Sequence, residues 1–238
     1  MPEPVRPAYH LYRWLWGSLD LLFPPTCGGC GQSGKLWCDA CQESVREIGT
    51  SICSVCGQPW DIPGLCARCA RTRPYFTKLR SWAYYDGPVS EAIKRLKYKR
   101  DISLGFVLAQ ALYNLLVNLQ WQVDGVIPVP LGVARLKERG YNQAALIAQP
   151  VALRIGKPYL RKGLFRVRET RSQVGLSYID RQANVNAAFR GREEIVAGKR
   201  LLVVDDVTTS TATLNACSQA LITAGAAEVM CLTVARAG

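Results

Sequence analysis

The chain has 238 residues and a mass of 26.3 kDa, enough for one ordinary core with a small additional module, or for two modest domains. Hydrophobic residues make up 49% of it and charged residues 20%, which excludes wholesale disorder, collagen-like repeats and coiled-coil architecture. The formal net charge is +12, so the distribution of basic residues bears on function.

The positive charge is concentrated in the C-terminal part of the chain. Up to Pro74 there are 7 basic and 6 acidic residues, whereas 23 basic and 12 acidic residues follow it. Between Arg135 and Arg181, 11 basic residues stand against 3 acidic ones. Such a segment either forms a solvated, solubilising surface or binds an anionic partner, and the motifs that flank it favour phosphate.

The first 24 residues predict an amphipathic leader helix. Its apolar side chains recur at helical spacing, at Tyr12, Leu15, Trp16, Leu19, Leu22 and Phe23. The apolar stretch is broken by Arg13 and Asp20 and ends at Pro24, so it is too short to span a bilayer. It also lacks the basic start and the cleavage site of a secretory signal. We expect a cytoplasmic protein without stable membrane insertion. The leader is expected to pack on the zinc ribbons or on the second domain; a membrane-surface role is the less favoured alternative, because its polar face has few basic residues.

Eight of the ten cysteines form four CxxC pairs in residues 25–73, namely Cys27 with Cys30, Cys38 with Cys41, Cys53 with Cys56, and Cys66 with Cys69. Two CxxC steps supply four thiolates to one tetrahedral ion, so the region predicts a double zinc ribbon with two structural Zn²⁺ ions. A sequential partition of the pairs is favoured, and a crossed one, in which the first and third pairs share an ion, stays open. A disulfide framework would need an oxidising compartment that no other feature supports.

Zinc also changes the charge of this module. Eight thiolates and two Zn²⁺ ions turn the charge up to Pro74 from +1 to −3. A net acidic module binds nucleic acid poorly, so the expected function of this module is scaffolding or partner docking.

From residue 75 to 238, short apolar strands alternate with helices, the pattern of a mostly parallel sheet covered on both faces. The expected strands are 80–85, 126–131, 200–206 and 229–234. The expected helices are 89–97, 104–117, 141–155 and 213–224. The predicted fold is therefore an α/β domain behind a small N-terminal zinc-ribbon module.

The segment from Val203 to Thr213 carries the richest chemistry. A buried strand delivers Asp205 and Asp206 at its carboxyl end, and a run of small hydroxyl residues then leads into a helix. Free N–H groups and the positive dipole end of a helix accept phosphate there, while the acids can accept hydrogen bonds from sugar hydroxyls. The alternative is an ordinary strand end with an Asp cap and solvated threonines.

At these residues the chain resembles the type I phosphoribosyltransferases, and specifically the ComF family. The resemblance covers nearly the whole chain: the aromatic leader, the CxxC ribbons, Lys97, Val126 to Leu131, Arg139 to Gln143, Thr170, Gln173, Leu176, Arg181, Asn184, Phe189 and the acid pair. One departure is Thr211, because the family loop usually carries glycine there. A β-branched residue resists positive φ and crowds a bound phosphate.

The resemblance implies a phosphoribosyl pyrophosphate (PRPP) site assisted by Mg²⁺, and transfer of a phosphoribosyl group with release of pyrophosphate. Asp205 and Asp206 would be the catalytic acids that hold the ribose. The 5′-phosphate would lie on Thr208, Thr209, Ser210, Thr211 and Thr213, and pyrophosphate on the amides of Val129, Leu131 and Gly132. The cleft and its lid would be lined by Arg135, Arg139, Asn142, Gln143, Arg168, Thr170, Gln173 and Arg181, although Asn142 and Gln143 could also be ordinary helix-start residues.

A second function stays open: a non-catalytic competence factor that handles single-stranded DNA during natural transformation, with PRPP as ligand or regulator. This alternative, too, follows from the resemblance. Basic residues interleaved with Tyr141, Phe165, Tyr178 and Phe189 would supply backbone contacts and stacking. Proteins of the competence machinery would dock on the zinc module. The absence of a GxxxxGK[ST] motif argues against an ATP-driven motor.

Overall fold

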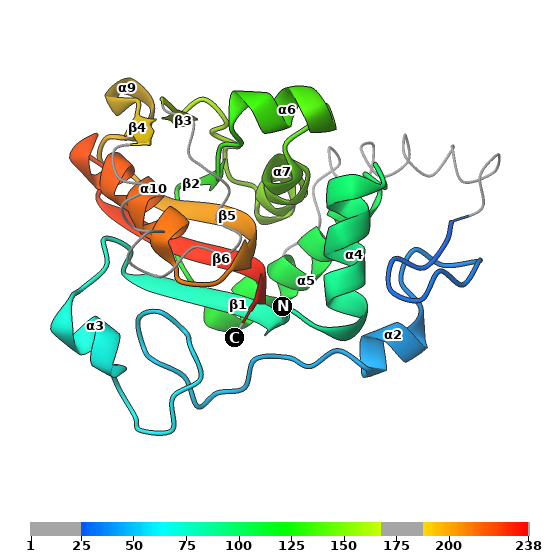
Figure 1. The fold of residues 1–238 in the computed structure, drawn as a ribbon. Coiled ribbons are helices and arrows are strands. Elements are labelled where there is room, and N and C mark those ends of the chain that lie inside the picture. Colours follow the sequence, from blue (N-terminus) through cyan, green and yellow to red (C-terminus); the bar gives the residue numbers. More distant parts are fainter. Residues whose placement is uncertain (1–24, 168–187, 238) are drawn as a thin grey trace.

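The computed structural model describes residues 25–167 and 188–237 (Figure 1). The predicted leader helix therefore lies outside the described residues. Among the described residues, no helix is long and apolar enough to cross a membrane.

The centre of the fold is a parallel sheet of four strands in the order β1-β6-β5-β2 (Figure 1). These strands are β1 (Lys78–Tyr84), β2 (Gly125–Pro128), β5 (Arg200–Thr208) and β6 (Glu228–Arg236). β5 pairs with β2 on one side and with β6 on the other. All four expected strands are present and parallel, so the α/β prediction is confirmed.

Three helices cover one face of the sheet: α4 (Gly87–Tyr98), α5 (Leu104–Leu119) and α7 (Gln143–Ile155). The other face is covered by α10 (Ala212–Thr223), by the hairpin of β3 (Leu164–Arg166) and β4 (Phe189–Gly191), and by α9 (Glu193–Val196). Alternate residues of β5 serve the two layers, because Leu201 and Val203 join one core and Leu202 and Val204 the other.

One short helix, α6 (Val133–Arg139), was not among the expected elements. It buries none of its residues, so it has no apolar face that a periodicity could have disclosed. Gly132 precedes it, and Gly140 ends it in the left-handed conformation at φ +83°.

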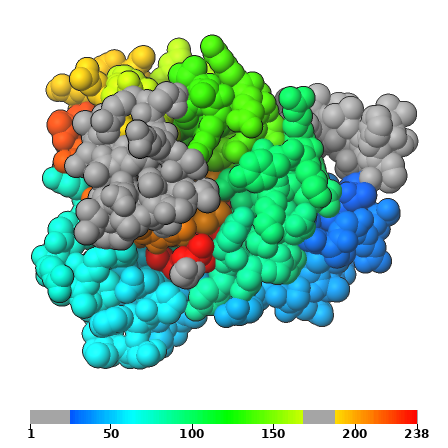
Figure 2. Space-filling model, in the orientation of Figure 1, coloured from blue at the N-terminus to red at the C-terminus, as the bar shows by residue number. Residues whose placement is uncertain are grey.

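The two cysteine-rich ribbons lie at opposite ends of the molecule, where they are marked by α2 (Asp39–Glu43) and α3 (Ala67–Arg71) (Figures 1 and 2). The chain between them runs along the free edge of β1. The amide of Ile48 donates to the Trp82 carbonyl at 3.0 Å, and the amide of Tyr84 donates to the Arg46 carbonyl at 2.9 Å. The ribbon module therefore shields the sheet edge at β1.

The second ribbon shares its core with the sheet. Cys53, Val55, Cys56, Cys66 and Cys69 belong to the same buried cluster as residues of β5, β6 and α10. The first ribbon contributes less to a core, because its apolar side chains that pack against the opposite cluster, Trp37 and Val45, are both partly exposed.

Candidate functional site

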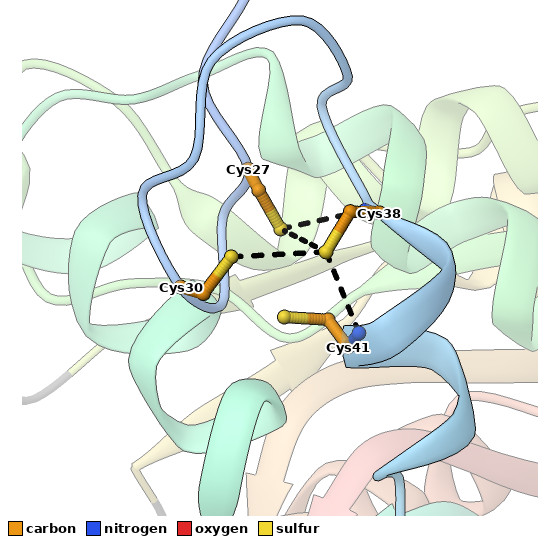
Figure 3. Close-up of side chains that lie close together, drawn as sticks. All are labelled: Cys27, Cys30, Cys38 and Cys41. Atoms are coloured by element: carbon orange, nitrogen blue, oxygen red, sulfur yellow. Dashed lines mark hydrogen bonds between the residues drawn. The ribbon is translucent and has the colours of Figure 1, made fainter.

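The structure contains two groups of four cysteines, each of which could bind one zinc ion. Cys27, Cys30, Cys38 and Cys41 form the first group (Figure 3), and Cys53, Cys56, Cys66 and Cys69 form the second. The sulfurs of each group lie within 4.8 Å of one another. Sγ–Sγ distances of 3.6 and 3.7 Å occur in the first group and of 3.7 Å in the second. A tetrahedral ion with Zn–S bonds of about 2.3 Å requires about 3.8 Å between sulfurs. The sequential partition is confirmed, and both groups fit Zn²⁺.

Backbone amides point at the sulfurs of both groups. The Cys38 amide donates to Cys27 Sγ at 3.4 Å, and the Cys66 amide donates to Cys53 Sγ at 3.3 Å. Burial alone would raise the pKa of Cys27 and Cys53, but the amide hydrogen bonds outweigh it and lower each pKa to about 6. The local backbone therefore favours the thiolate form that a metal needs.

Each ribbon is tied to the α/β domain by an arginine of that domain. Arg95 of α4 donates to the Cys27 carbonyl at 2.6 Å and to Thr26 Oγ1 at 2.9 Å. Arg236, at the end of β6 and 4% exposed, donates to the Cys56 carbonyl. Both arginines donate to the carbonyls of cysteines in the zinc groups, so α4 helps to position the first group and β6 the second.

The acid pair lies at the carboxyl end of β5, and its two members have different surroundings. Asp206 is 3% exposed, forms an ion pair with Lys97 Nζ, and accepts a hydrogen bond from Gln143 Nε2 at 2.9 Å. Asp205 is half-buried, and its Oδ1 accepts from the Asp206 amide at 2.9 Å. Asp206 is anchored by α4 and α7, which leaves Asp205 as the more accessible carboxylate.

The charges of these acids follow from the same contacts. Burial raises the pKa of Asp205 well above its ordinary value, and the neighbouring charge of Asp206 adds to the effect. Burial opposes ionisation of Asp206 too, but Lys97 and Gln143 outweigh it and hold the pKa of Asp206 below its ordinary value. Asp206 is therefore the more acidic member of the pair, and Asp205 takes up a proton first as the pH falls.

The helix-start residues Asn142 and Gln143 do more than cap α7. Asn142 Oδ1 accepts from the Ala144 amide at 3.0 Å, as an N-cap does, and its Nδ2 donates to the Val129 carbonyl at 2.9 Å. Gln143 is buried, binds Asp206, and accepts a hydrogen bond from Arg139. A continuous polar chain thus joins α6, α7, β5 and α4.

The loop after β5 adopts the strained conformation that Thr211 was expected to resist. Thr211 has φ +65° and ψ 1° and is 8% exposed. A non-glycine residue in this region costs about 1–3 kcal/mol, so the surrounding structure must hold it there. Thr208 is buried at the strand end, Ser210 is half-buried and Thr209 is exposed. Thr211 directly precedes α10, and Thr213 lies in its first turn.

The predicted pyrophosphate donors need one correction. The Val129 amide donates to the Val204 carbonyl at 2.9 Å, so it continues the ladder between β2 and β5 and is not a free donor. Leu131 is half-buried and Gly132 buried, and within residues 25–167 and 188–237 their amides meet no acceptor. Arg135 is exposed on α6. The lid residues Arg168, Thr170, Gln173 and Arg181 lie outside the described residues.

Sequence reasoning missed one side chain that reaches the loop. Arg68 of α3, half-buried in the second ribbon, donates from Nη1 to the Ser210 carbonyl at 3.2 Å. Its partner lies 142 residues further along the chain, so no local pattern could have disclosed the contact.

Comparison with known proteins agrees with this architecture. The double zinc ribbon domain family matches residues 18–70, and the phosphoribosyl transferase domain family matches residues 103–238. The fold and the strand-end acids thus define a phosphoribosyltransferase-type α/β protein with an N-terminal double zinc ribbon. The chain belongs to the ComF family.

Three relatives illustrate the match. DNA utilization protein YhgH of Salmonella typhi is 34% identical over 82% of this chain and 88% of its own length. Competence protein F of Haemophilus influenzae is 31% identical over 84% of this chain and 90% of its own. Competence protein ComFC of Bacillus subtilis is 25% identical over 93% of this chain and 89% of its own.

Proposed function

We propose that the chain binds PRPP at the carboxyl ends of β2 and β5. The observation that carries this proposal is the arrangement around Asp205 and Asp206. Lys97 and Gln143 anchor one acid, the other is half-buried beside it, and a short hydroxyl-rich loop leads from both into the amino end of α10. Ribose hydroxyls are held by carboxylates, and a 5′-phosphate by amides at a helix start.

Different residues around the loop after β5 contact different parts of PRPP. The ribose hydroxyls donate to the carboxylate oxygens of Asp205 and Asp206. Lys97 favours the ionised form of Asp206. The 5′-phosphate lies on the amides and hydroxyls of residues 208–213, and pyrophosphate meets the amides of Leu131 and Gly132. A carboxylate beside substrate phosphates is the ligand set that Mg²⁺ accepts, so Asp205 and the phosphates of PRPP would hold the ion, which would neutralise pyrophosphate charge. Such a site can stabilise the departure of pyrophosphate from ribose C1.

Replacing Asp205 by Asn tests the ligand contacts. A hydrogen bond to a charged group contributes about 1.5–3 kcal/mol, so Asp205→Asn should weaken PRPP binding roughly 30-fold, and Asp205→Asn with Asp206→Asn more strongly still. Titration calorimetry with Mg²⁺ measures the affinity. Asp124→Asn is the matched control, because Asp124 binds Arg200 at the opposite end of β5. Unaltered binding in the double variant would remove this loop from the site.

A specific surface favours a second function, binding of single-stranded DNA. Exposed basic side chains lie on and beside the paired strands β3 and β4: Arg190 is in β4, Arg161 and Lys162 precede β3, and Arg192 follows β4. The Arg192 guanidinium lies 5.5 Å from the ring centre of Phe165. The similar proteins named for competence and DNA utilization support this reading. The expected stacking by Phe189 is wrong, because Phe189 is 7% exposed and packs in the core.

DNA binding is expected to be weak and to fall steeply with salt. For single strands, the logarithm of affinity falls with a slope of about 0.7 per phosphate contact. Replacing Arg190 and Arg192 by Ala should therefore reduce the slope by about 1.4. Fluorescence anisotropy with a labelled oligonucleotide measures it. Arg71→Ala with Arg73→Ala, two exposed arginines next to the acidic ribbon, is the control, and a larger loss in this control would place the DNA on the zinc module. If PRPP and DNA bind independently of each other, the two ligands occupy separate surfaces.

A further inference from the structure

The fourth CxxC pair places a cation between two zinc ligands and aims it at the loop after β5. Arg68 lies between Cys66 and Cys69, so zinc at the second site fixes its backbone on both sides. Nη1 donates to the Ser210 carbonyl at 3.2 Å, and Nη2 donates to Gln58 Oε1 of the same ribbon at 3.3 Å. The guanidinium thus bridges the ribbon and the loop.

The Ser210 carbonyl controls the direction of the next amide. A peptide bond is planar and trans, so its carbonyl and its N–H point in opposite directions. With the Ser210 carbonyl turned toward Arg68, the Thr211 N–H faces away from the ribbon, and it meets no acceptor among the residues described. A flip of this peptide would reverse the N–H and return Thr211 to the negative φ that a β-branched residue prefers.

We infer that Arg68 is a positioning residue: it holds the Ser210–Thr211 peptide in the orientation that presents the Thr211 amide to the 5′-phosphate, against the preference of Thr211 for negative φ. The inference rests on the proposed PRPP site. It assigns the second zinc ribbon a role in the α/β site beyond folding. Arg68 becomes dispensable when residue 211 tolerates positive φ, as glycine does.

A double-mutant cycle tests this role. Arg68→Ala is expected to weaken PRPP binding about tenfold in the natural chain, but less than about threefold in the Thr211→Gly background, where the strained conformation needs no support. Thr211→Gly alone should preserve or improve affinity. Arg71→Ala is the matched control, because Arg71 is exposed on the same short helix and its loss changes the charge equally. Arg68→Lys, which keeps the positive charge and a donor group at the end of the side chain, should restore part of the affinity.

A second measurement separates this inference from the proposed function. Hydrogen exchange of the segment 209–215, followed by mass spectrometry without ligand, should accelerate at least fivefold in Arg68→Ala and remain unchanged in Arg71→Ala. Zinc content shows whether the ribbon is intact, and Arg68→Met, which retains the aliphatic stem, replaces Arg68→Ala if zinc is lost. Equal losses of affinity in both backgrounds, or unchanged exchange, would overturn the inference. Absent PRPP binding in the natural chain would instead refute the proposed function, while the exchange result still decides the role of Arg68.

Discussion

Replacing Lys97 by Met is expected to lower the free energy of unfolding at pH 7 by about 3–5 kcal/mol, because it leaves the buried carboxylate of Asp206 without its cation. The side chains of Lys97 and Asp206 are 19% and 4% exposed. Denaturant unfolding measures the loss. Lys99→Met is the matched control at the end of the same helix, since Lys99 pairs with Glu91 at 3.5 Å and is 67% exposed, and a surface pair contributes about 0–1 kcal/mol.

The loss should also depend on pH in a definite direction. In the natural chain, Lys97 holds the pKa of Asp206 low, so this carboxylate contributes stability above its unfolded pKa of about 3.9 and loses it as the pH falls through the lower folded value. Without Lys97, burial raises the pKa of Asp206, and ionisation then favours the unfolded state as the pH rises. The deficit of Lys97→Met should therefore shrink between pH 7 and pH 5. Adding Asp206→Asn should recover part of it, and a deficit that does not vary with pH would contradict the pairing.

Loss of the second zinc is expected to damage the whole fold, and loss of the first to damage it less. Structural zinc contributes about 10–16 kcal/mol in zinc-finger peptides, whereas an entire domain is stable by about 5–15 kcal/mol. All four cysteines of the second site are buried, and they share a core with the sheet, whereas Cys30 of the first site is exposed. Cys56→Ser should therefore lower Tm by at least about 10–20 °C, and Cys30→Ser by at most about half as much.

Elemental analysis and calorimetry check these two variants. The natural chain should carry two zinc ions, and each variant one. Less than one zinc in protein purified without chelator, with disulfides in its place, would contradict the zinc assignment. Equal Tm losses in the two variants would contradict the stronger coupling of the second ribbon to the sheet. That coupling also means that removing residues 1–74 would expose core, so DNA binding is better tested with full-length variants.

Sequence patterns sufficed where the determining contacts are local. The continuous apolar run of β5 and the run of small hydroxyl residues before α10 predicted both elements and the place of Asp205 and Asp206. The CxxC spacing predicted both zinc groups, because each ligand pair is built within four residues.

The missing parts depend on contacts between distant residues. The anchor of Asp206 comes from Lys97 and Gln143, which are brought to it by α4 and α7. The Val129 amide was expected to be free, but the pairing of β2 with β5 occupies it. The hairpin strands β3 and β4 have three residues each and are far apart in sequence, so neither gives a readable alternation.

Diffraction from crystals grown with PRPP and Mg²⁺ tests whether PRPP binds at the carboxyl ends of β2 and β5. We expect electron density for the ribose hydroxyls at the carboxylates of Asp205 and Asp206, for the 5′-phosphate within residues 208–213, and for pyrophosphate at Leu131 and Gly132. Density on the β3–β4 hairpin instead, with the loop after β5 empty at saturating PRPP, would contradict it.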